Sequence, residues 1–197
     1  FSEENNCRLN FVENGQHWLH TDREAAAMRK WEQTVLEHCY PCLDYISLHQ
    51  YYGGQEKGTA EFLAQSLDME RYIETVLNIC DYVRVKKKMS HKINICFDEW
   101  GVWSMSDVQV QKSVEDAPWQ TAPAISEQIY TMEDALLFAS MLMNFIKRAD
   151  RVKIACQSLL TNISSCIMTE EDGGVWVQPV YYPFALMAKY AHGVTLD

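Results

Sequence analysis

The chain has 197 residues, of which 48% are hydrophobic and 22% are charged, a composition typical of a globular domain with a sizeable core. Its 17 basic and 27 acidic residues give a formal net charge of −10, which disfavours binding to the phosphate backbone of nucleic acid. No apolar run reaches the ~18 residues of a membrane span, so no membrane partner is expected. No signal peptide pattern is visible and the seven cysteines are an odd number, so we expect a cytoplasmic protein.

The cysteines predict neither a redox centre nor a metal site. Cys39 and Cys42 form a C-x-x-C motif, but a reactive pair needs a helix N-terminus, and this pair ends a predicted helix, where the dipole opposes a thiolate. His38 beside them lacks a second ligand pair at zinc spacing. No metal site is therefore expected. Four further cysteines in apolar segments are expected to be buried free thiols: Cys80, Cys96, Cys156 and Cys166.

Apolar spacing near 3.6 residues predicts the helices in chain order. They cover residues 22–39, 60–89 (in two pieces), 131–146 and 181–190. Pro41 should end the first helix, and Thr131 with Asp134 fits a capping box at the start of the third. Residues 1–20 carry little pattern beyond a short strand candidate at 7–12.

Alternating apolar and polar residues predict three strands between these helices. They cover residues 44–51, 93–98 and 152–159, whereas 104–129 and 163–178 are expected to be irregular. Strands that alternate with helices imply parallel βαβ units with right-handed crossovers. Three or four such units are too few to close a barrel of eight, so we expect an α/β fold that is either part of a (β/α)8 barrel or an open sheet.

The stretch INICFDEWGVW at 93–103 is the leading candidate for a catalytic strand. It begins as a strand and then runs into Asp98 and Glu99, followed by Trp100 and Gly101. In an α/β barrel the carboxyl ends of the strands carry the active site, so Glu99 is the first catalytic candidate. The alternative is that the two carboxylates only solvate a loop start or cap a helix.

His49 and Tyr51 end the preceding predicted strand, and Trp103 follows Glu99 closely. Carboxylates, a polar histidine and aromatic rings suit sugar chemistry, because a carboxylate can attack an anomeric carbon and an aromatic face can hold sugar C–H groups. Taken alone, His49 would be a satisfied polar residue and Tyr51 a packing residue. Their place one strand before Glu99 favours a site.

Three motifs resemble the family 51 glycoside hydrolases. They are DYISLHQYYG at 44–53, FDEWGVW at 97–103, and ADRVKIACQSLLTNISSCIMTEEDGGVWVQPVYYPF at 149–184. Members of that family are retaining α-L-arabinofuranosidases on a (β/α)8 barrel. The resemblance implies that residues 31–197 are the C-terminal part of such a catalytic domain, roughly strand five or six to strand eight, while 1–30 form a poorly matching N-terminal segment.

The resemblance also implies roles for single residues. Glu99 matches the catalytic nucleophile at the end of the seventh strand, and Trp103 matches the aromatic residue beside it. His49 and Tyr51 match residues that line the arabinose subsite at the end of the sixth strand. The implied reaction releases terminal α-L-arabinofuranosyl residues from arabinose-containing oligosaccharides or polysaccharides and needs no cofactor. Leu159 stands where the family often has a glutamine on the eighth strand.

The family's acid/base glutamate, which follows an asparagine, has no counterpart in this sequence, where Glu13 precedes Asn14 instead. A retaining glycosidase needs two carboxyl groups, so we expect a fragment of a larger enzyme. The alternative is a non-catalytic half-barrel remnant that binds a sugar or a partner. Exposed strand edges would favour association, including a homo-oligomer. These residues are also compatible with a related glycosidase that acts on cellulose or xylan.

Overall fold

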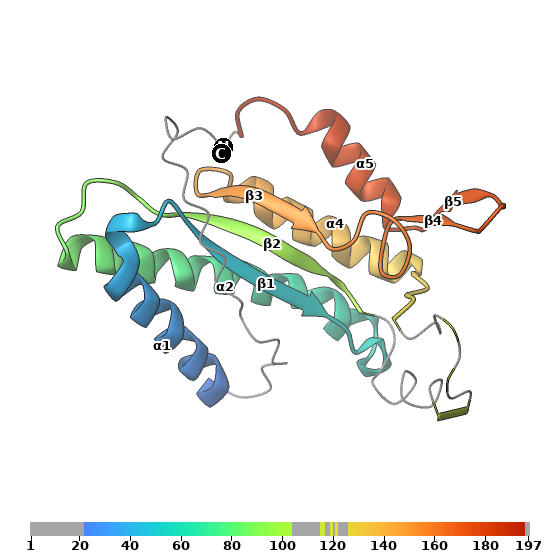
Figure 1. Ribbon diagram of the computed structural model, residues 1–197, viewed down its shortest axis with the longest axis horizontal. Coiled ribbons are helices and arrows are strands. Elements are labelled where there is room, and N and C mark those ends of the chain that lie inside the picture. The colour runs from blue at the N-terminus through green and yellow to red at the C-terminus, as the bar shows by residue number, and fades with distance from the viewer. Residues whose placement is uncertain (1–21, 104–114, 117–118, 120, 122–125, 196–197) are drawn as a thin grey trace.

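The computed structural model describes residues 22–103, 115–116, 119, 121 and 126–195 (Figure 1). The strand expected at 7–12 and most of the irregular segment expected at 104–129 lie outside these residues. The main helices are α1 (Asp22–Cys39), α2 (Thr59–Lys86), α4 (Met132–Lys147) and α5 (Tyr181–Tyr190). The strands are β1 (Tyr45–Tyr52), β2 (Asn94–Val102), β3 (Val152–Gln157), β4 (Ile167–Thr169) and β5 (Val175–Val177), and two 3-10 turns cover Tyr40–Cys42 and Gln55–Lys57.

The three longer strands form one parallel sheet in the order β1-β2-β3. Helix α2 connects β1 to β2, and α4 leads from β2 to β3, so the predicted βαβ units are confirmed. All three strands point the same way, and their carboxyl ends therefore meet at one edge of the sheet. Within the described residues this sheet is open, with β1 and β3 as its edges.

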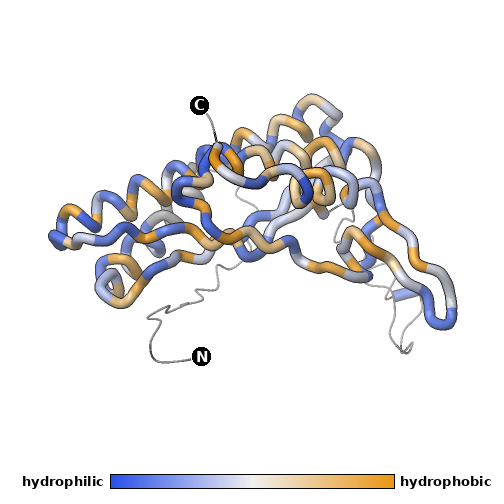
Figure 2. Tube along the Cα trace, turned by 90° about the horizontal axis from the view of Figure 1, so that it is seen from above, coloured by the Kyte–Doolittle hydropathy of each residue, from blue (hydrophilic) through white to orange (hydrophobic). Residues whose placement is uncertain are grey.

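The helices lie on one face of the sheet and bury the core there. Figures 1 and 2 show α2 and α4 side by side behind the strands, with α1 against α2 and α5 against α4. The sheet contributes alternate side chains to this core, and the largest is Trp100, which is fully buried against Phe138 and Phe145 with ring centroids 4.6 and 5.0 Å away. The opposite face of the sheet carries the polar side chains of Ser47, His49 and Asp98.

A β-bulge in β2 sets which side chains reach that opposite face. Ser47 pairs with Cys96 and His49 with Glu99, so two residues of β2, Phe97 and Asp98, oppose one residue of β1. Phe97 is buried in the helix-covered core, whereas Asp98 and Glu99 both contact His49. A regular strand would have sent Glu99 to the same face as Phe97. The bulge therefore turns two successive carboxylates to one face, as bulges near active sites often do.

The helix boundaries follow the sequence closely. The capping box at α4 is present, because Asp134 Oδ2 accepts from the Thr131 N–H at 2.6 Å and the Thr131 hydroxyl accepts from the Asp134 N–H at 3.4 Å. The two-piece helix expected at 60–89 is wrong, since α2 is one continuous helix of 28 residues. Its buried side chains lie between Phe62 and Val83, along the length of this one helix.

Two further expectations are corrected. The segment 163–178 is not wholly irregular, because β4 and β5 form an antiparallel hairpin there. Cys156 is exposed rather than buried, although Cys80, Cys96 and Cys166 are buried as expected. Cys39 and Cys42 are exposed free thiols at the end of α1 and of the 3-10 turn that follows. Among the described helices, none combines the length and apolarity needed to cross a membrane.

Candidate functional site

His49 lies between two carboxylates at the carboxyl end of the sheet. Its Nε2 is 3.4 Å from Asp98 Oδ1, and its Nδ1 is 3.6 Å from Glu99 Oε2. The side chains of His49 and Asp98 are each 13% exposed, whereas Glu99 is 41% exposed. Glu99 is thus the carboxylate that a molecule from solvent can reach.

Asp98 is held from β1. The buried hydroxyl of Ser47 donates to Asp98 Oδ1 at 2.6 Å, and the same hydroxyl lies 3.3 Å from His49 Nε2. Ser47 and His49 are two residues apart on one strand, so both project to the same face. Asp98 is therefore engaged within the protein and orients the imidazole ring.

Tyr51 contacts the other carboxylate. Its phenol donates to Glu99 Oε2 at 3.3 Å, and its ring packs against Trp103 with centroids 5.1 Å apart. Burial raises the pKa of Tyr51 to about 12, a hydrogen bond from the Ser158 side chain opposes that rise, and the charge of Glu99 adds to it. The phenol consequently stays protonated at neutral pH and acts as a donor.

Gly101 leaves room for the Tyr51 ring to pack on the backbone of β2. A Cβ on Gly101 would lie 3.6 and 3.7 Å from two carbons of that ring, which is ordinary van der Waals contact. The backbone of β2 therefore passes directly under the ring, and a side chain larger than alanine would push it away from Glu99.

The segment after β3 forms the third side of the site. The hydrogen bond between Ser158 and the Tyr51 phenol connects this segment to the Tyr51–Glu99 pair. Gln157 accepts instead from the Cys166 thiol at 2.9 Å, and Leu159 is 42% exposed. In this structure the polar partner that the segment after β3 offers to the site is thus a serine.

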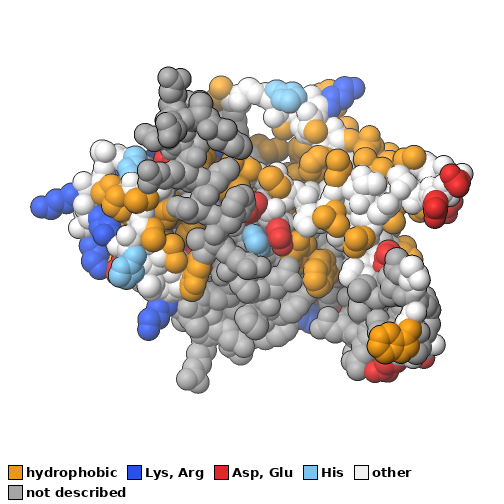
Figure 3. Space-filling model, in the orientation of Figure 1, with side chains coloured by type: hydrophobic (Ala, Val, Ile, Leu, Met, Phe, Trp, Pro, Cys, Tyr) orange, Lys and Arg blue, Asp and Glu red, His pale blue; other side chains and the backbone are white. Residues whose placement is uncertain are grey.

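Acidic and histidine side chains lie side by side near the middle of the sheet face, with apolar side chains around them (Figure 3). Among the residues that the structure describes, no group of three or more His, Cys, Asp or Glu side chains is arranged to hold a metal ion. The arrangement offers an exposed carboxylate, a hydrogen-bond donor to one of its oxygens and two aromatic rings. A carboxylate in this setting can attack a carbon atom of a bound ligand. The aromatic rings can hold the face of a cyclic ligand.

All four residues singled out from the sequence, His49, Tyr51, Glu99 and Trp103, come together in the structure. Sequence reasoning missed two of their partners. Ser47 could have been found, because it alternates with His49 along β1. Ser158 carried no comparable signal, since nothing in its local pattern relates it to Tyr51.

Comparison with known proteins identifies relatives of this chain. The family model of the α-L-arabinofuranosidase C-terminal domain matches residues 98–197. An intracellular exo-α-(1→5)-L-arabinofuranosidase of Acetivibrio thermocellus is 44% identical over 178 residues, which are 90% of this chain and 35% of the relative. The enzyme of the same name from Halalkalibacterium halodurans is 46% identical over 177 residues, again 90% of this chain and 35% of the relative.

Two solved structures share the fold. A family 51 α-L-arabinofuranosidase from Bifidobacterium longum gives a TM-score of 0.76 at 36% identity, covering 84% of this chain and 35% of that one. An α-L-arabinofuranosidase from Thermotoga maritima, in complex with arabinose, gives a TM-score of 0.65 at 25% identity, covering 82% and 30%. The chain thus spans about a third of the length of the curated relatives it matches.

Proposed function

Because the chain belongs to the family 51 α-L-arabinofuranosidases, we propose that it supplies the nucleophile half of a retaining glycoside hydrolase, with Glu99 as the nucleophile. The observation that carries the proposal is the setting of Glu99. It is the more exposed of two adjacent carboxylates at the carboxyl end of the sheet, and a protonated phenol donates to it. The second carboxyl group that this reaction requires would come from sequence outside these 197 residues.

The contacts of Glu99 also suggest which of its oxygens attacks. In the described part of the chain, both Tyr51 and His49 contact Oε2. Oε1 is then the oxygen that forms the bond to the anomeric carbon. Holding Oε2 fixes the plane of the carboxylate, and a fixed geometry at the reacting atoms is a large part of an enzymatic rate enhancement.

The reaction has two balanced steps. In the first, Oε1 bonds to the anomeric carbon while the bond to the leaving oxygen breaks, and that oxygen takes a proton from the external carboxylic acid. In the second, water attacks the anomeric carbon, the bond to Glu99 breaks, and the water's proton goes to the same external carboxylate. The Tyr51 phenol would stabilise Glu99 as it leaves with its negative charge restored.

The remaining site residues have supporting roles in this proposal. His49, Tyr51 and Trp103 would line the subsite for a terminal α-L-arabinofuranosyl group of an oligosaccharide or polysaccharide. The Tyr51 and Trp103 rings, tilted by 45° to each other, offer ring surface for sugar C–H groups. Asp98 would hold His49 rather than react, because its Oδ1 already accepts from Ser47.

The proposal extends to the setting of the chain. We propose that β1, β2 and β3 are the sixth, seventh and eighth strands of a (β/α)8 barrel, within a C-terminal catalytic segment of residues 31–197. Without the other strands, the backbone groups at the edges of β1 and β3 would favour self-association into a homo-oligomer. The relatives named intracellular are the basis for a proposed cytoplasmic location.

The first experiment uses the 197-residue chain and a mechanism-based furanoside inactivator with a good leaving group, which needs little help from an acid. We expect mass spectrometry to find the glycosyl label on Glu99. Glu99→Gln should take up no label, whereas Glu171→Gln, the same change at the exposed hairpin tip, should be labelled like the parent. A label on Asp98 instead would move the nucleophile role to that residue.

The second experiment supplies the missing part. In a chimera, this chain replaces the matching third of the Acetivibrio thermocellus relative. We expect the chimera to hydrolyse an aryl α-L-arabinofuranoside and its Glu99→Gln variant to be inactive. A folded chimera that binds arabinose but neither turns over substrate nor accepts the label would overturn the proposal and favour a non-catalytic remnant.

A further inference from the structure

A buried glutamine joins three separate stretches of chain beside the candidate site. The side chain of Gln178 is only 7% exposed. Its Nε2 donates to the carbonyls of Gln128 at 3.0 Å and Ser165 at 3.1 Å, and its Oε1 accepts from the Tyr130 N–H at 3.0 Å. Both amide N–H groups and the amide oxygen therefore have hydrogen-bond partners, which fixes the orientation of the amide group.

Tyr130 carries this connection to the strand that holds Glu99. It is 6% exposed, and its phenolic oxygen lies 3.0 Å from the carbonyl of Val102 and 3.0 Å from the carbonyl of Ser164. Val102 is the last residue of β2, three positions after Glu99. One phenol thus ties the end of the catalytic strand to the segment that follows β3.

The far end of that segment reaches the nucleophile. The Ser164 hydroxyl lies 3.4 Å from the carbonyl of Ser158. The Ser158 side chain is hydrogen-bonded to the phenol of Tyr51, which in turn donates to Glu99 Oε2. The contacts form a continuous path from Gln178 through Tyr130, Ser164, Ser158 and Tyr51 to Glu99.

We propose that Gln178 and Tyr130 are positioning residues that hold segment 158–166 against the end of β2, so that Ser158 fixes the Tyr51 phenol on Glu99. Neither residue touches Glu99, and each acts through Ser158 and Tyr51. The consequence for catalysis rests on the proposed function, whereas the path of contacts to Tyr51 does not. A displaced phenol would leave the Glu99 carboxylate free to rotate, and misplacement of this kind slows reactions strongly.

The decisive variant is Tyr130→Phe, because it removes one hydroxyl and keeps the buried ring. Tyr40→Phe is its matched control: Tyr40 is also buried and its phenol also donates to a backbone carbonyl, that of His91 at 3.4 Å. That contact lies before β1 and β2 begin, at the amino end of the sheet. The two variants make the same chemical change at opposite ends of the strands.

The first readout is independent of catalysis. In the 197-residue chain labelled with ¹³C at tyrosine Cζ, the Tyr51 signal is assigned from its absence in Tyr51→Phe. We expect Tyr130→Phe to move or broaden this signal in the same way as Ser158→Ala, and Tyr40→Phe to leave it in place. An unchanged Tyr51 signal in folded Tyr130→Phe would overturn the proposal. Gln178→Leu, if folded, should repeat the effect.

The second readout is the rate at which the furanoside inactivator labels Glu99. We expect a loss of about tenfold or more in Tyr130→Phe and none in Tyr40→Phe. If the parent chain is not labelled at all, the proposed function fails while the tyrosine signals still decide the positioning path. If the Tyr51 signal moves but the labelling rate is unchanged, the path stands as structure and its role in catalysis is overturned.

Discussion

The phenolic oxygen of Tyr51 lies 3.3 Å from Oε2 of Glu99, across two neighbouring parallel strands. The register sets this contact, because His49 is opposite Glu99 and Tyr51 is opposite Gly101. The residue under the Tyr51 ring thus has no side chain, and the ring can lean toward the carboxylate. A carboxylate held in this way presents its other oxygen in one orientation.

The first prediction concerns that contact. Tyr51→Phe should slow labelling of Glu99 by about tenfold, because the carboxylate loses its donor and turns more freely. The free energy of unfolding should fall by only about 1 kcal/mol, the usual contribution of one hydrogen bond. Labelling rates and urea unfolding measure the two effects. A rate equal to that of the parent would mean that the phenol does not position Glu99.

The second prediction concerns the bulge in β2. Deleting Asp98 should leave a folded protein, because Phe97 then faces the core, Glu99 the open face and Trp100 the core in regular alternation. We expect the free energy of unfolding to fall by no more than about 2 kcal/mol, since Ser47 loses its acceptor. Deleting Phe97 is the control. It places a carboxylate in the core and should prevent cooperative unfolding, which near-UV circular dichroism can follow.

The third prediction concerns the amino end of the sheet. Arg151 is buried, donates to both oxygens of Asp81 at 3.2 and 3.0 Å, and donates to the Ile93 carbonyl at 2.7 Å. Arg151→Met should lower the free energy of unfolding by about 2–3 kcal/mol, because the Ile93 carbonyl loses a charged donor. Arg148→Met is the comparison.

Arg148 forms only partly exposed ion pairs, at 3.9 Å with Glu70 and 3.5 Å with Glu74. Its loss should cost less than about 1 kcal/mol. Urea unfolding of both variants tests the difference. Equal effects would show that Arg151 is no more important than a surface arginine.

The fourth prediction concerns alkaline pH. Burial raises the pKa of the Cys80 thiol from 9.0 to about 12. Below pH 9 the folded and unfolded states both keep this proton, so the thiol has no effect. Between pH 9 and about pH 12 the unfolded state loses the proton and the folded state keeps it, so stability falls as pH rises.

The loss from this one thiol approaches about 1.4 kcal/mol per pH unit. Cys80→Ala should therefore flatten the alkaline decline of the unfolding free energy, whereas Cys39→Ala, at an exposed thiol, should not. Unfolding under reducing conditions from about pH 8 to about pH 11 measures both slopes. An identical slope in the parent and Cys80→Ala would contradict the assignment.

Much of the fold follows from periodicity in the sequence. The bounds of α1 and α5 agree with the expected ones residue for residue, because an apolar stripe, a stop at Pro41 and a final glycine mark their ends. The sheet order could be expected from the alternation of strands and helices. The hairpin of β4 and β5 was missed because strands of three residues are too short for an alternating pattern to stand out.

The candidate site was predictable only in part. The carboxyl ends of adjacent parallel strands must meet, which brings His49 and Tyr51 close to Glu99 and Trp103. The bulge was not predictable, since its sequence is compatible with a regular strand that ends at Asp98. The sequence also could not predict the contacts of Ser158, Tyr130 and Gln178. These contacts depend on irregular segments, in which the apolar residues have no helical or strand spacing.

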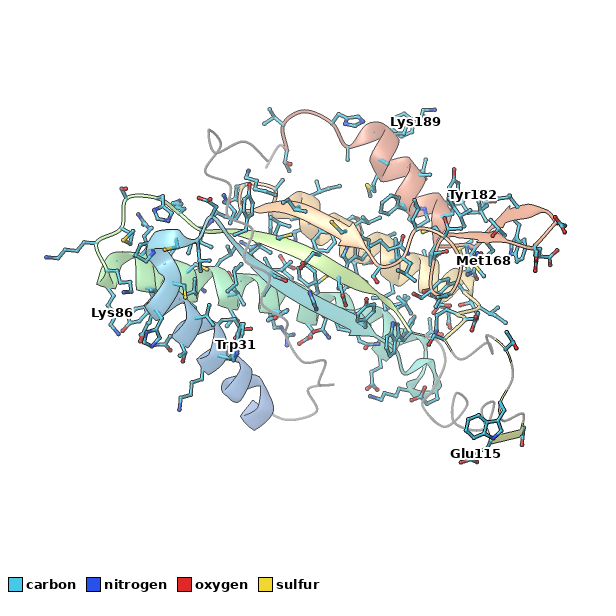
Figure 4. All side chains as sticks on the ribbon, in the orientation of Figure 1. Trp31, Lys86, Glu115, Met168, Tyr182 and Lys189 are labelled. Carbon is cyan, nitrogen blue, oxygen red and sulfur yellow. The ribbon has the colours of Figure 1, made fainter. Side chains whose placement is uncertain are left out.

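The candidate site and the basic end of α2 lie at opposite ends of the molecule. Figure 4 shows Met168 of β4 and Tyr182 of α5 at one end, with Lys86 of α2 at the other. The hairpin and the segment before it lie at the end where the strands finish, beside the site. The basic end of α2 is remote from it, which makes substitutions there suitable references for the site variants.

Side chains of the sheet alternate between the core and the open face, and random substitution should affect the two classes of position differently. Variants at Ile95, Phe97 and Trp100 should lower the yield of folded protein, because these side chains lie in the core. Variants at His49 and Glu99 should accumulate as folded chains that have lost reactivity. The class of a position in β2 follows odd or even numbering up to Phe97 and reverses after Asp98. A mutational scan can score abundance and labelling separately. In such a scan, the positions of β2 that lower abundance should be odd-numbered up to Phe97 and even-numbered after Asp98.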